Sequence, residues 1–286
     1  MSTDRRYAAV AAPFGRDLER GFEAIASGLE QARRRGAELV AFPECALGGP
    51  PGLCERLADD PVPPALDRDG PELARLAALA PDLVVCAGFT ERTSSGRYST
   101  AACVHGGKIL DLHRKVHIPP SELRTYCAGS SFHAFDTPVG RIGMLNCYDK
   151  VFPEAARSLA LAGAETIVAM SAWPASRERP TGELADDTQS LHFDLMDQAR
   201  AVENQVVWVS SNLSGGFGPL RFLGQAKVID PDGHILSRTT PGSPGIAVGG
   251  VPSADLLKTT RRAISHLRDR RPPAYGPLPS YGVAIA

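Results

Sequence analysis

The chain has 286 residues, of which 43% are hydrophobic and 22% are charged. This balance excludes a disordered chain, which would lack the apolar surface needed to offset the entropy of ordering. The 31 basic and 32 acidic residues leave a net charge of −1, which argues against a basic surface for nucleic acid or anionic membranes.

The sequence carries no visible export or membrane segment. The apolar run at residues 8–13 is closed by the charged stretch 16–20, too early for the ~7–15 apolar residues of a secretory signal. No apolar run approaches the ~18 residues of a membrane span. We therefore expect a cytoplasmic protein with reduced thiols. Its six scattered cysteines are Cys45, Cys54, Cys86, Cys103, Cys127 and Cys147.

The first half alternates strands with helices. Apolar residues at helical spacing predict an amphipathic helix over 18–35, which ends at Gly36 after three arginines. Gly106 and Gly107 predict the turn of a hairpin. In chain order we predict strand 7–12, helix 18–35, strand 39–42, helix 71–80, strand 83–89, and two hairpins, 98–105 with 108–114 and 132–136 with 141–146.

The second half continues this alternation to a proline-rich tail at 267–286. We predict helix 153–162, strand 166–170, helix 188–204, strand 206–211, a hairpin of 223–229 with 234–238, and helix 254–265. No repeat, composition break or linker divides the chain, so we expect one α/β domain over residues 1–286. The hairpins interrupt the βαβ rhythm, which indicates mixed rather than wholly parallel sheets.

Two common cofactor motifs are missing. No phosphate-binding loop of the type G-x-x-x-x-G-K-[ST] occurs, and the glycine cluster at 215–218 lacks dinucleotide-binding spacing. His113 and His117 have the four-residue spacing of a helical metal pair, but they lie at a strand end beside Pro119 and Pro120. We expect this position to keep the imidazoles apart, solvated or hydrogen-bonded. The sequence therefore predicts neither a cofactor nor a metal.

Three residues lie where apolar strands end. Glu44 follows the strand 39–42, Lys115 follows 108–114, and Cys147 follows 141–146 just before a helix. Taken alone, a structural ion pair explains Glu44, a surface position explains Lys115, and a buried inert thiol explains Cys147 equally well. A thiol at a strand-to-helix junction, however, also lies near N–H groups that favour a thiolate and bind an oxyanion.

The three residues together form a plausible catalytic set. Strand ends on one edge of a layered α/β fold converge on one pocket. A cysteine nucleophile needs a proton acceptor and a positive charge, and a glutamate with a lysine supplies both without histidine. A Cys-His hydrolase using His192, His234 or His266 is an alternative, although no local motif ties these histidines to Cys147.

Three segments carry a family resemblance. Phe42-Pro-Glu-Cys45, His113-Arg-Lys-Val-His-Ile-Pro119 and Gly143-Met-Leu-Asn-Cys-Tyr-Asp149 with Phe152-Pro-Glu154 resemble the nitrilase superfamily of carbon–nitrogen hydrolases. Its hallmark is a Glu-Lys-Cys triad in this chain order. The resemblance covers nearly the whole chain and implies a four-layer α-β-β-α sandwich that commonly pairs into a homodimer.

The resemblance implies a role for each site residue. Glu44 would be the general base, Lys115 the stabiliser of the tetrahedral intermediate and Cys147 the nucleophile. The backbone N–H of Tyr148 would complete the oxyanion hole, and Glu122 would position the substrate. Trp173 is expected either as a pocket wall or as a packing residue, and the polar stretch 175–187 as a lid over the pocket.

Cys147-Tyr148-Asp149 resembles the amidase branch rather than true nitrilases, which usually have Cys-Trp-Glu. We therefore expect an amidase that hydrolyses a linear carboxamide to acid and ammonia without a cofactor. An N-carbamoyl amide hydrolase, a nitrilase and a catalytically silent binding protein of the same fold are the alternatives. The resemblance implies that the tail 267–286, with Tyr275 and Tyr281 as anchors, packs on a partner subunit.

Overall fold

The computed structural model describes residues 5–51 and 62–275, and the predictions for Cys54 and Tyr281 lie outside these residues. The helices are α1 (Leu18–Arg34), α2 (Pro71–Ala78), α3 (Pro153–Leu161), α4 (Thr188–Asn204) and α5 (Ala254–Ala263), with short 3-10 helices η1 (Pro120–Glu122), η2 (Cys147–Val151), η3 (Leu184–Asp186) and η4 (Pro272–Ala274). The strands are β1 (Arg5–Ala12), β2 (Leu39–Ala41), β3 (Ala65–Leu66), β4 (Val84–Thr93), β5 (Gly96–His105), β6 (Lys108–Arg114), β7 (Ala134–Thr137), β8 (Gly140–Asn146), β9 (Thr166–Ser171), β10 (Val207–Phe217), β11 (Leu220–Leu223), β12 (Lys227–Ile229), β13 (Ile235–Arg238) and β14 (Gly245–Val251).

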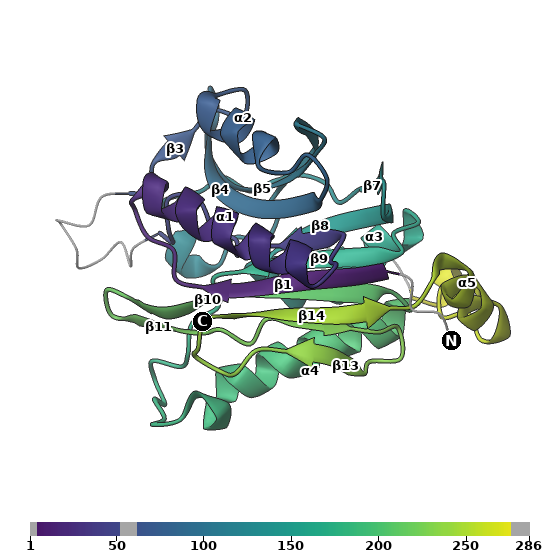
Figure 1. Ribbon diagram of the computed structural model, residues 1–286. Coiled ribbons are helices and arrows are strands. Elements are labelled where there is room, and N and C mark those ends of the chain that lie inside the picture. Colours follow the sequence, from purple (N-terminus) through teal and green to yellow (C-terminus); the bar gives the residue numbers. More distant parts are fainter. Residues whose placement is uncertain (1–4, 52–61, 276–286) are drawn as a thin grey trace.

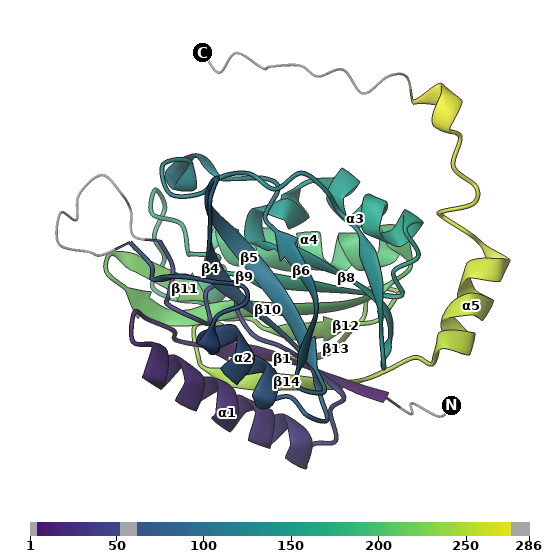
Figure 2. The same cartoon turned by 90° about the horizontal axis from the view of Figure 1, so that it is seen from above.

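The strands form two sheet halves that are joined at one point. Their central order is β6-β5-β4-β2-β1-β10-β9-β8-β7. β1 and β10 pair over only two positions, Ala11 with Asn212 and Ala12 with Leu213, so the sheet folds there into two layers. Helices α1 and α2 cover the outer face of one layer, and α3 and α4 cover the outer face of the other (Figures 1 and 2).

Successive side chains of β1 point alternately into two different hydrophobic clusters, one on each face of the sheet. Ala8 and Val10 point into the cluster beneath α1, whereas Tyr7 and Ala9 point into the cluster between the two sheet halves. A third cluster lies between α3, α4 and the second half. The predicted four-layer α-β-β-α sandwich with mixed sheets is thus confirmed.

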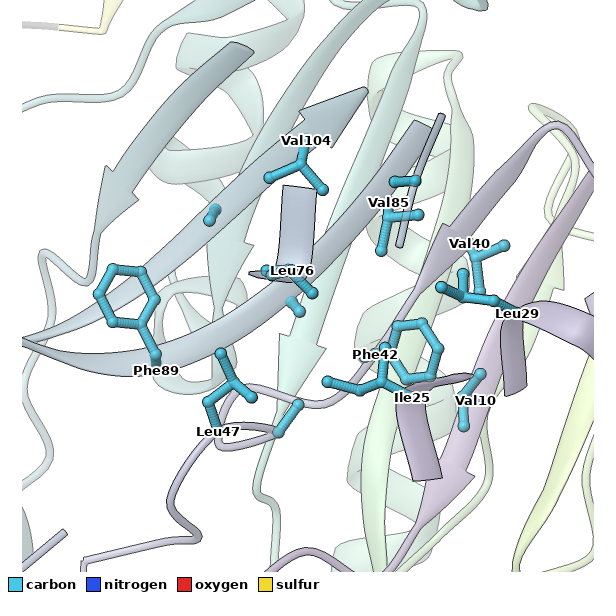
Figure 3. Packing of buried hydrophobic residues seen from close by; sticks show 14 of the residues in the cluster. Val10, Ile25, Leu29, Val40, Phe42, Leu47, Leu76, Val85, Phe89 and Val104 are labelled. Atoms are coloured by element: carbon cyan, nitrogen blue, oxygen red, sulfur yellow. The ribbon is translucent and has the colours of Figure 1, made fainter. Parts of the chain in front are cut away.

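Close packing under α1 requires a small residue at Gly28. The Phe42 ring lies against this helix, and a Cβ at Gly28 would lie 2.8 Å from its Cε1 atom. Ile25 and Leu29 flank the same ring (Figure 3). The helix therefore presses directly on the segment that leads from β2 into Glu44.

Several predicted boundaries were wrong. The strand predicted at 206–211 continues to Phe217 as β10 and turns back into β11. The predicted strand 223–229 is broken because Gly224 and Gln225 both adopt positive φ, so Leu223 ends β11 and β12 starts at Lys227. Strand β14, which pairs with all but the last residue of β1, was missed.

One edge of the sandwich collects the ends of parallel strands. β2, β4, β8, β9 and β10 run in the same direction as β1, and two antiparallel steps through β5 give β6 that direction too. The residues that follow β2, β6, β8 and β9 therefore meet at one edge. Within the described ranges, no helix combines the length and apolar character needed to cross a membrane.

Candidate active site

A buried chain of charges occupies the edge where these strands end. The Lys115 ammonium donates to Glu44 Oε1 at 2.9 Å and to Glu122 Oε2 at 2.7 Å. Ser99 Oγ also donates to Glu44 Oε1, at 2.8 Å. Lys115 has no solvent-exposed surface and Glu44 is 2% exposed, so the interpretation of Lys115 as a surface lysine is wrong.

Two carboxylates keep the buried lysine charged. Burial by itself lowers the pKa of Lys115, but the charges of Glu122 and Glu44 outweigh it and raise that pKa well above its usual value. Burial raises the pKa of Glu122, helped by the charge of Glu44 and opposed by Lys115. The result is a buried positive charge, in surroundings where electrostatic interactions are stronger than in bulk water.

Glu44 is placed by close backbone packing against β4. A Cβ at Gly88 would lie 1.7 Å from the Glu44 carbonyl oxygen, so only glycine fits there. The Gly88 N–H donates to Pro43 O, and its carbonyl accepts from Leu47 N–H. Among the described residues, Glu44 Oε2 has no hydrogen-bond partner. One oxygen of this carboxylate thus binds Lys115 and the other is available to a proton donor.

Cys147 lies at the junction of β8 and η2 in a left-handed backbone conformation. Its φ of 45° is uncommon for a residue with a side chain and marks a local strain of the kind found at functional sites. Burial and then the charge of Glu44 raise the pKa of its thiol well above the usual value, although Lys115 opposes them. These two effects outweigh the N–H groups at the strand-to-helix junction, which were expected to favour a thiolate.

Asp149 connects the turn of Cys147 to the segment that carries Lys115. Its carboxylate accepts from His113 Nε2 and His117 Nδ1, both at 2.9 Å, and from the backbone N–H groups of Val116 and His117. The Asn146 N–H donates to it as well. The two imidazoles were expected to stay apart, yet they meet on this one carboxylate. Sequence analysis missed this role of Asp149.

These bonds also fix the charge of Asp149. Burial alone raises the pKa of Asp149, but hydrogen bonds from His113 and His117 override burial and lower it well below its ordinary value. The carboxylate is therefore an ionised anchor, and it holds the His113 side chain before Lys115 and the backbone after Lys115 against the turn of Cys147.

A cavity of about 730 Å³ opens in front of this cluster. Glu122, Tyr148 and Trp173, all predicted to bind substrate, line it together with Cys147. Trp173 is 8% exposed and packs edge-on against Phe193, so it serves as both a wall and a packing residue. The remaining lining residues are Pro50, Pro51, Pro119, Ser121, Ala172, Pro174, Ala175, Ser176, Arg177, Glu178, Gln189, Leu220 and Phe222.

Other candidate groups lie outside this cavity. Within the part of the chain that the structure describes, its lining includes none of His192, His234 and His266, which gives the Cys-His alternative no support. The turn with Asp230, Asp232 and His234 brings three potential metal ligands within 4.8 Å of one another. We assign no metal to it, since the Asp230 carboxylate already accepts a hydrogen bond from His234 Nδ1.

A family model confirms the resemblance that the three segments carry. Residues 6–261 match the model described as carbon-nitrogen hydrolase. The chain belongs to the carbon–nitrogen hydrolase family. It is therefore an enzyme of the class that hydrolyses carbon–nitrogen bonds, and the alternative of a silent binding protein loses its basis.

Relatives within the family bear amidase and nitrilase names. The chain is 28% identical to an N-carbamoylputrescine amidase of Arabidopsis thaliana, with 86% of each chain covered. It is 28% identical to a deaminated glutathione amidase of Bos taurus over 92% of this chain and 80% of that one. A protein of Schizosaccharomyces pombe described as a probable nitrilase is 31% identical over 61% of each.

The fold agrees with solved structures of the family. A carbon–nitrogen hydrolase from Helicobacter pylori superposes with a TM-score of 0.81 at 23% identity, covering 97% of this chain and 98% of that one. At this identity the likeness concerns the fold alone, and the substrate has to be inferred from the residues of the site.

Proposed function

We propose that this hydrolase is an amidase that converts a linear carboxamide to acid and ammonia through a thioester on Cys147. One observation carries the proposal. The wholly buried Lys115 ammonium is held between Glu44 and Glu122, and Glu122 lines the same cavity as Cys147. A base, a fixed cation and a nucleophile are the groups that acyl transfer from an amide requires.

The first half of the reaction follows from this arrangement. The partnerless Oε2 of Glu44 takes the thiol proton while the Cys147 sulfur attacks the amide carbon. The Lys115 ammonium and the Tyr148 N–H stabilise the oxyanion that forms. As the carbon–nitrogen bond breaks, Glu44 returns the proton to the leaving nitrogen. Ammonia departs and the acyl group remains as a thioester.

The second half reuses the same base. Glu44 removes a proton from water while the water oxygen attacks the thioester carbon. The carbon–sulfur bond breaks, the Cys147 sulfur recovers a proton, and the acid leaves. A buried thiol with a raised pKa suits this sequence, because the proton moves only when the substrate is in place.

Hydrolysis of an N-carbamoyl compound is the second candidate. Two relatives named N-carbamoylputrescine amidase each match 86% of this chain, and the same residues would attack a carbamoyl carbon.

Nitrile hydrolysis is the third candidate. The nitrile nitrogen would have to gain a proton during attack, and Glu44 would supply it. In this chain Tyr148 and Asp149 follow Cys147, as in the amidase-like motif, whereas true nitrilases usually have Cys-Trp-Glu. This difference favours the amide as substrate.

Ammonia release and acyl-enzyme mass separate the three candidates. The wild-type enzyme should release ammonia from one or more of a panel of small primary amides, and rapid quenching should trap an acyl adduct on Cys147. Turnover of N-carbamoyl amines alone would replace the amidase assignment with the second candidate. Conversion of nitriles but not amides to acids would point to a nitrilase.

A further inference from the structure

A second buried charge cluster lies behind the pocket, formed by side chains from three elements. The Lys150 ammonium from η2 donates to Asp197 Oδ1 of α4 at 2.8 Å, and Lys227 from β12 donates to Asp197 Oδ2 at 2.9 Å. All three residues are wholly buried. Trp208 Nε1 donates to Asp197 as well, and Lys227 also pairs with Asp194.

Lys150 ties this cluster to the active site in two directions. It lies three residues after Cys147 in the same short helix, and its own carbonyl accepts from Arg200 Nε at 3.0 Å. Its ammonium lies 3.1 Å from the centre of the Phe193 ring and 5.2 Å from that of Trp173. The Lys227 ammonium also lies 4.1 Å from the centre of the Phe193 ring, so Lys150 differs from it by its place in the turn of Cys147 and by its approach to Trp173, which lines the pocket.

Stability alone does not account for a lysine at this position. A buried ion pair gains little over apolar residues of similar volume, because desolvation offsets the attraction between the charges. A charge that is kept in such surroundings has more to contribute to geometry and to the local field than to the free energy of folding.

We propose that Lys150, anchored by Asp197, is a positioning residue of the active site: it fixes the turn of Cys147 and the Trp173 wall, and its positive charge favours the thiolate that forms during attack. The proposal rests on the function proposed above, in which Cys147 is the nucleophile. Lys227 has a different part, since it keeps Asp197 paired from the side of β12.

The electrostatic surroundings agree with this role. Burial lowers the pKa of Lys150 to about 8, with Asp197 opposing and Lys227 adding to the decrease. The charges on Lys150 and Cys147 also act on each other. The lysine is consequently still protonated at neutral pH, and loses its charge only as the pH rises through this value.

The test compares Lys150→Met with Lys227→Met, two identical substitutions around one carboxylate. Each leaves Asp197 with the other lysine and Trp208, so both variants should fold. The first readout is the pH dependence of iodoacetamide alkylation at Cys147, followed by intact mass. The second is kcat and KM on whichever amide the wild type turns over. Lys150→Gln, which keeps a donor for Asp197, replaces Lys150→Met if the latter is insoluble.

In Lys150→Met, iodoacetamide should alkylate Cys147 at least about threefold more slowly near neutral pH. The pH dependence of the alkylation rate should move to higher pH, because a nearby cation is lost. Its kcat should fall by about 10- to 100-fold, the scale of a misplaced reacting group. Lys227→Met should lose comparable thermal stability and keep the alkylation profile. If both variants keep the wild-type profile, or both shift it equally, the proposal is overturned.

Alkylation requires no turnover, so the two proposals fail separately. Absence of amide hydrolysis in the wild type would remove the proposed function and leave the alkylation comparison valid. A normal alkylation profile in an active Lys150→Met enzyme would remove the positioning role and leave the amidase intact.

Discussion

The chemistry of individual residues depends here on burial more than on sequence context. Burial and then the charge of Glu44 raise the pKa of the Cys147 thiol, whereas the charges of Glu122 and Glu44 keep Lys115 charged against the effect of burial. Glu44 contributes to both pKa shifts, because its negative charge opposes a thiolate and favours an ammonium. The lysine therefore rests in the charged state that an oxyanion needs, whereas the thiol must still lose its proton to Glu44 when the substrate is in place.

Substitution of Cys147 by serine tests the nucleophile. A serine hydroxyl is far harder to deprotonate than a thiol, so Cys147→Ser should fold, lose nearly all turnover and give no acyl adduct in intact-mass measurements. Cys45→Ser and Cys103→Ser are the controls and should keep activity if they fold. Wild-type rates in the Cys147 variant would remove the covalent mechanism.

Substitutions of Lys115 test whether the shape of its charged group matters in addition to its charge. Arginine keeps the charge, but its planar guanidinium cannot replace a compact ammonium between Glu44 and Glu122. Lys115→Arg should fold and lose activity by about 10²-fold or more, the scale of one lost oxyanion donor. Lys115→Met should be at least as inactive and should raise the pKa of Cys147, read from its alkylation profile. More than half the wild-type rate in Lys115→Arg, with unchanged alkylation, would place Lys115 outside the site.

At the level of elements, periodicity and turn residues predicted most of the fold. The helices now labelled α1 and α4 and the hairpins that contain β6 and β8 follow from apolar spacing and from glycine turns. β14 was missed because its run Gly245–Val251 contains three glycines, and it is a strand only through its pairing with β1. Tertiary context overrides local propensity in such cases.

The site was predictable where motifs carried it, and not where it depends on contacts between distant segments. Glu44, Lys115 and Cys147 stand in recognisable segments. Asp149 joins two of these segments, and Lys150 meets Asp197 across 47 residues of sequence. No local pattern in a single sequence reveals such pairs.

Asp149→Asn tests the link between the turn of Cys147 and the segment of Lys115. An amide cannot accept all of these hydrogen bonds, and its NH₂ would face backbone donors. Each buried group left unsatisfied costs about 1–3 kcal/mol. We therefore expect the unfolding temperature of Asp149→Asn to fall by several degrees and its kcat to fall strongly. Calorimetry and steady-state kinetics measure both effects.

The stability that Asp149 contributes should depend on pH in a defined direction. The pKa of Asp149 is lower in the folded state than its unfolded value of about 3.9. Its contribution is therefore complete above about pH 5 and declines as the pH falls toward the folded value. Urea unfolding should show the largest gap between wild type and Asp149→Asn at neutral pH and a smaller gap below about pH 4. A gap that stays constant would contradict an ionised anchor.

At the scale of the whole molecule, the C-terminal region stands apart from the sandwich. Ile264 and His266, directly after α5, still bond to Gln205 at the end of α4, and beyond them Figure 2 shows the chain leaving the layered body. Tyr275 is 56% exposed, and its hydroxyl accepts only from the nearby Arg271 N–H among the bonds that the described residues make. Leu191 and Leu195 are also exposed on the outer face of α4. A tail with few contacts to its own subunit gains stability by packing on another.

We accordingly propose that the enzyme is a homodimer and that residues after Pro272 strengthen it. Light scattering at micromolar concentration should show a dimer for the full chain. Truncation after Pro272 should weaken dimerisation by at least about tenfold in Kd, which corresponds to about 1.4 kcal/mol. Tyr275→Ala in the full chain should weaken it less, because only one contact is lost. Cys147→Ser serves as the control, since an inactive site has no reason to change assembly. A stable monomer for the full chain, or a truncated chain that dimerises as tightly, would show that the tail does not cross to a partner.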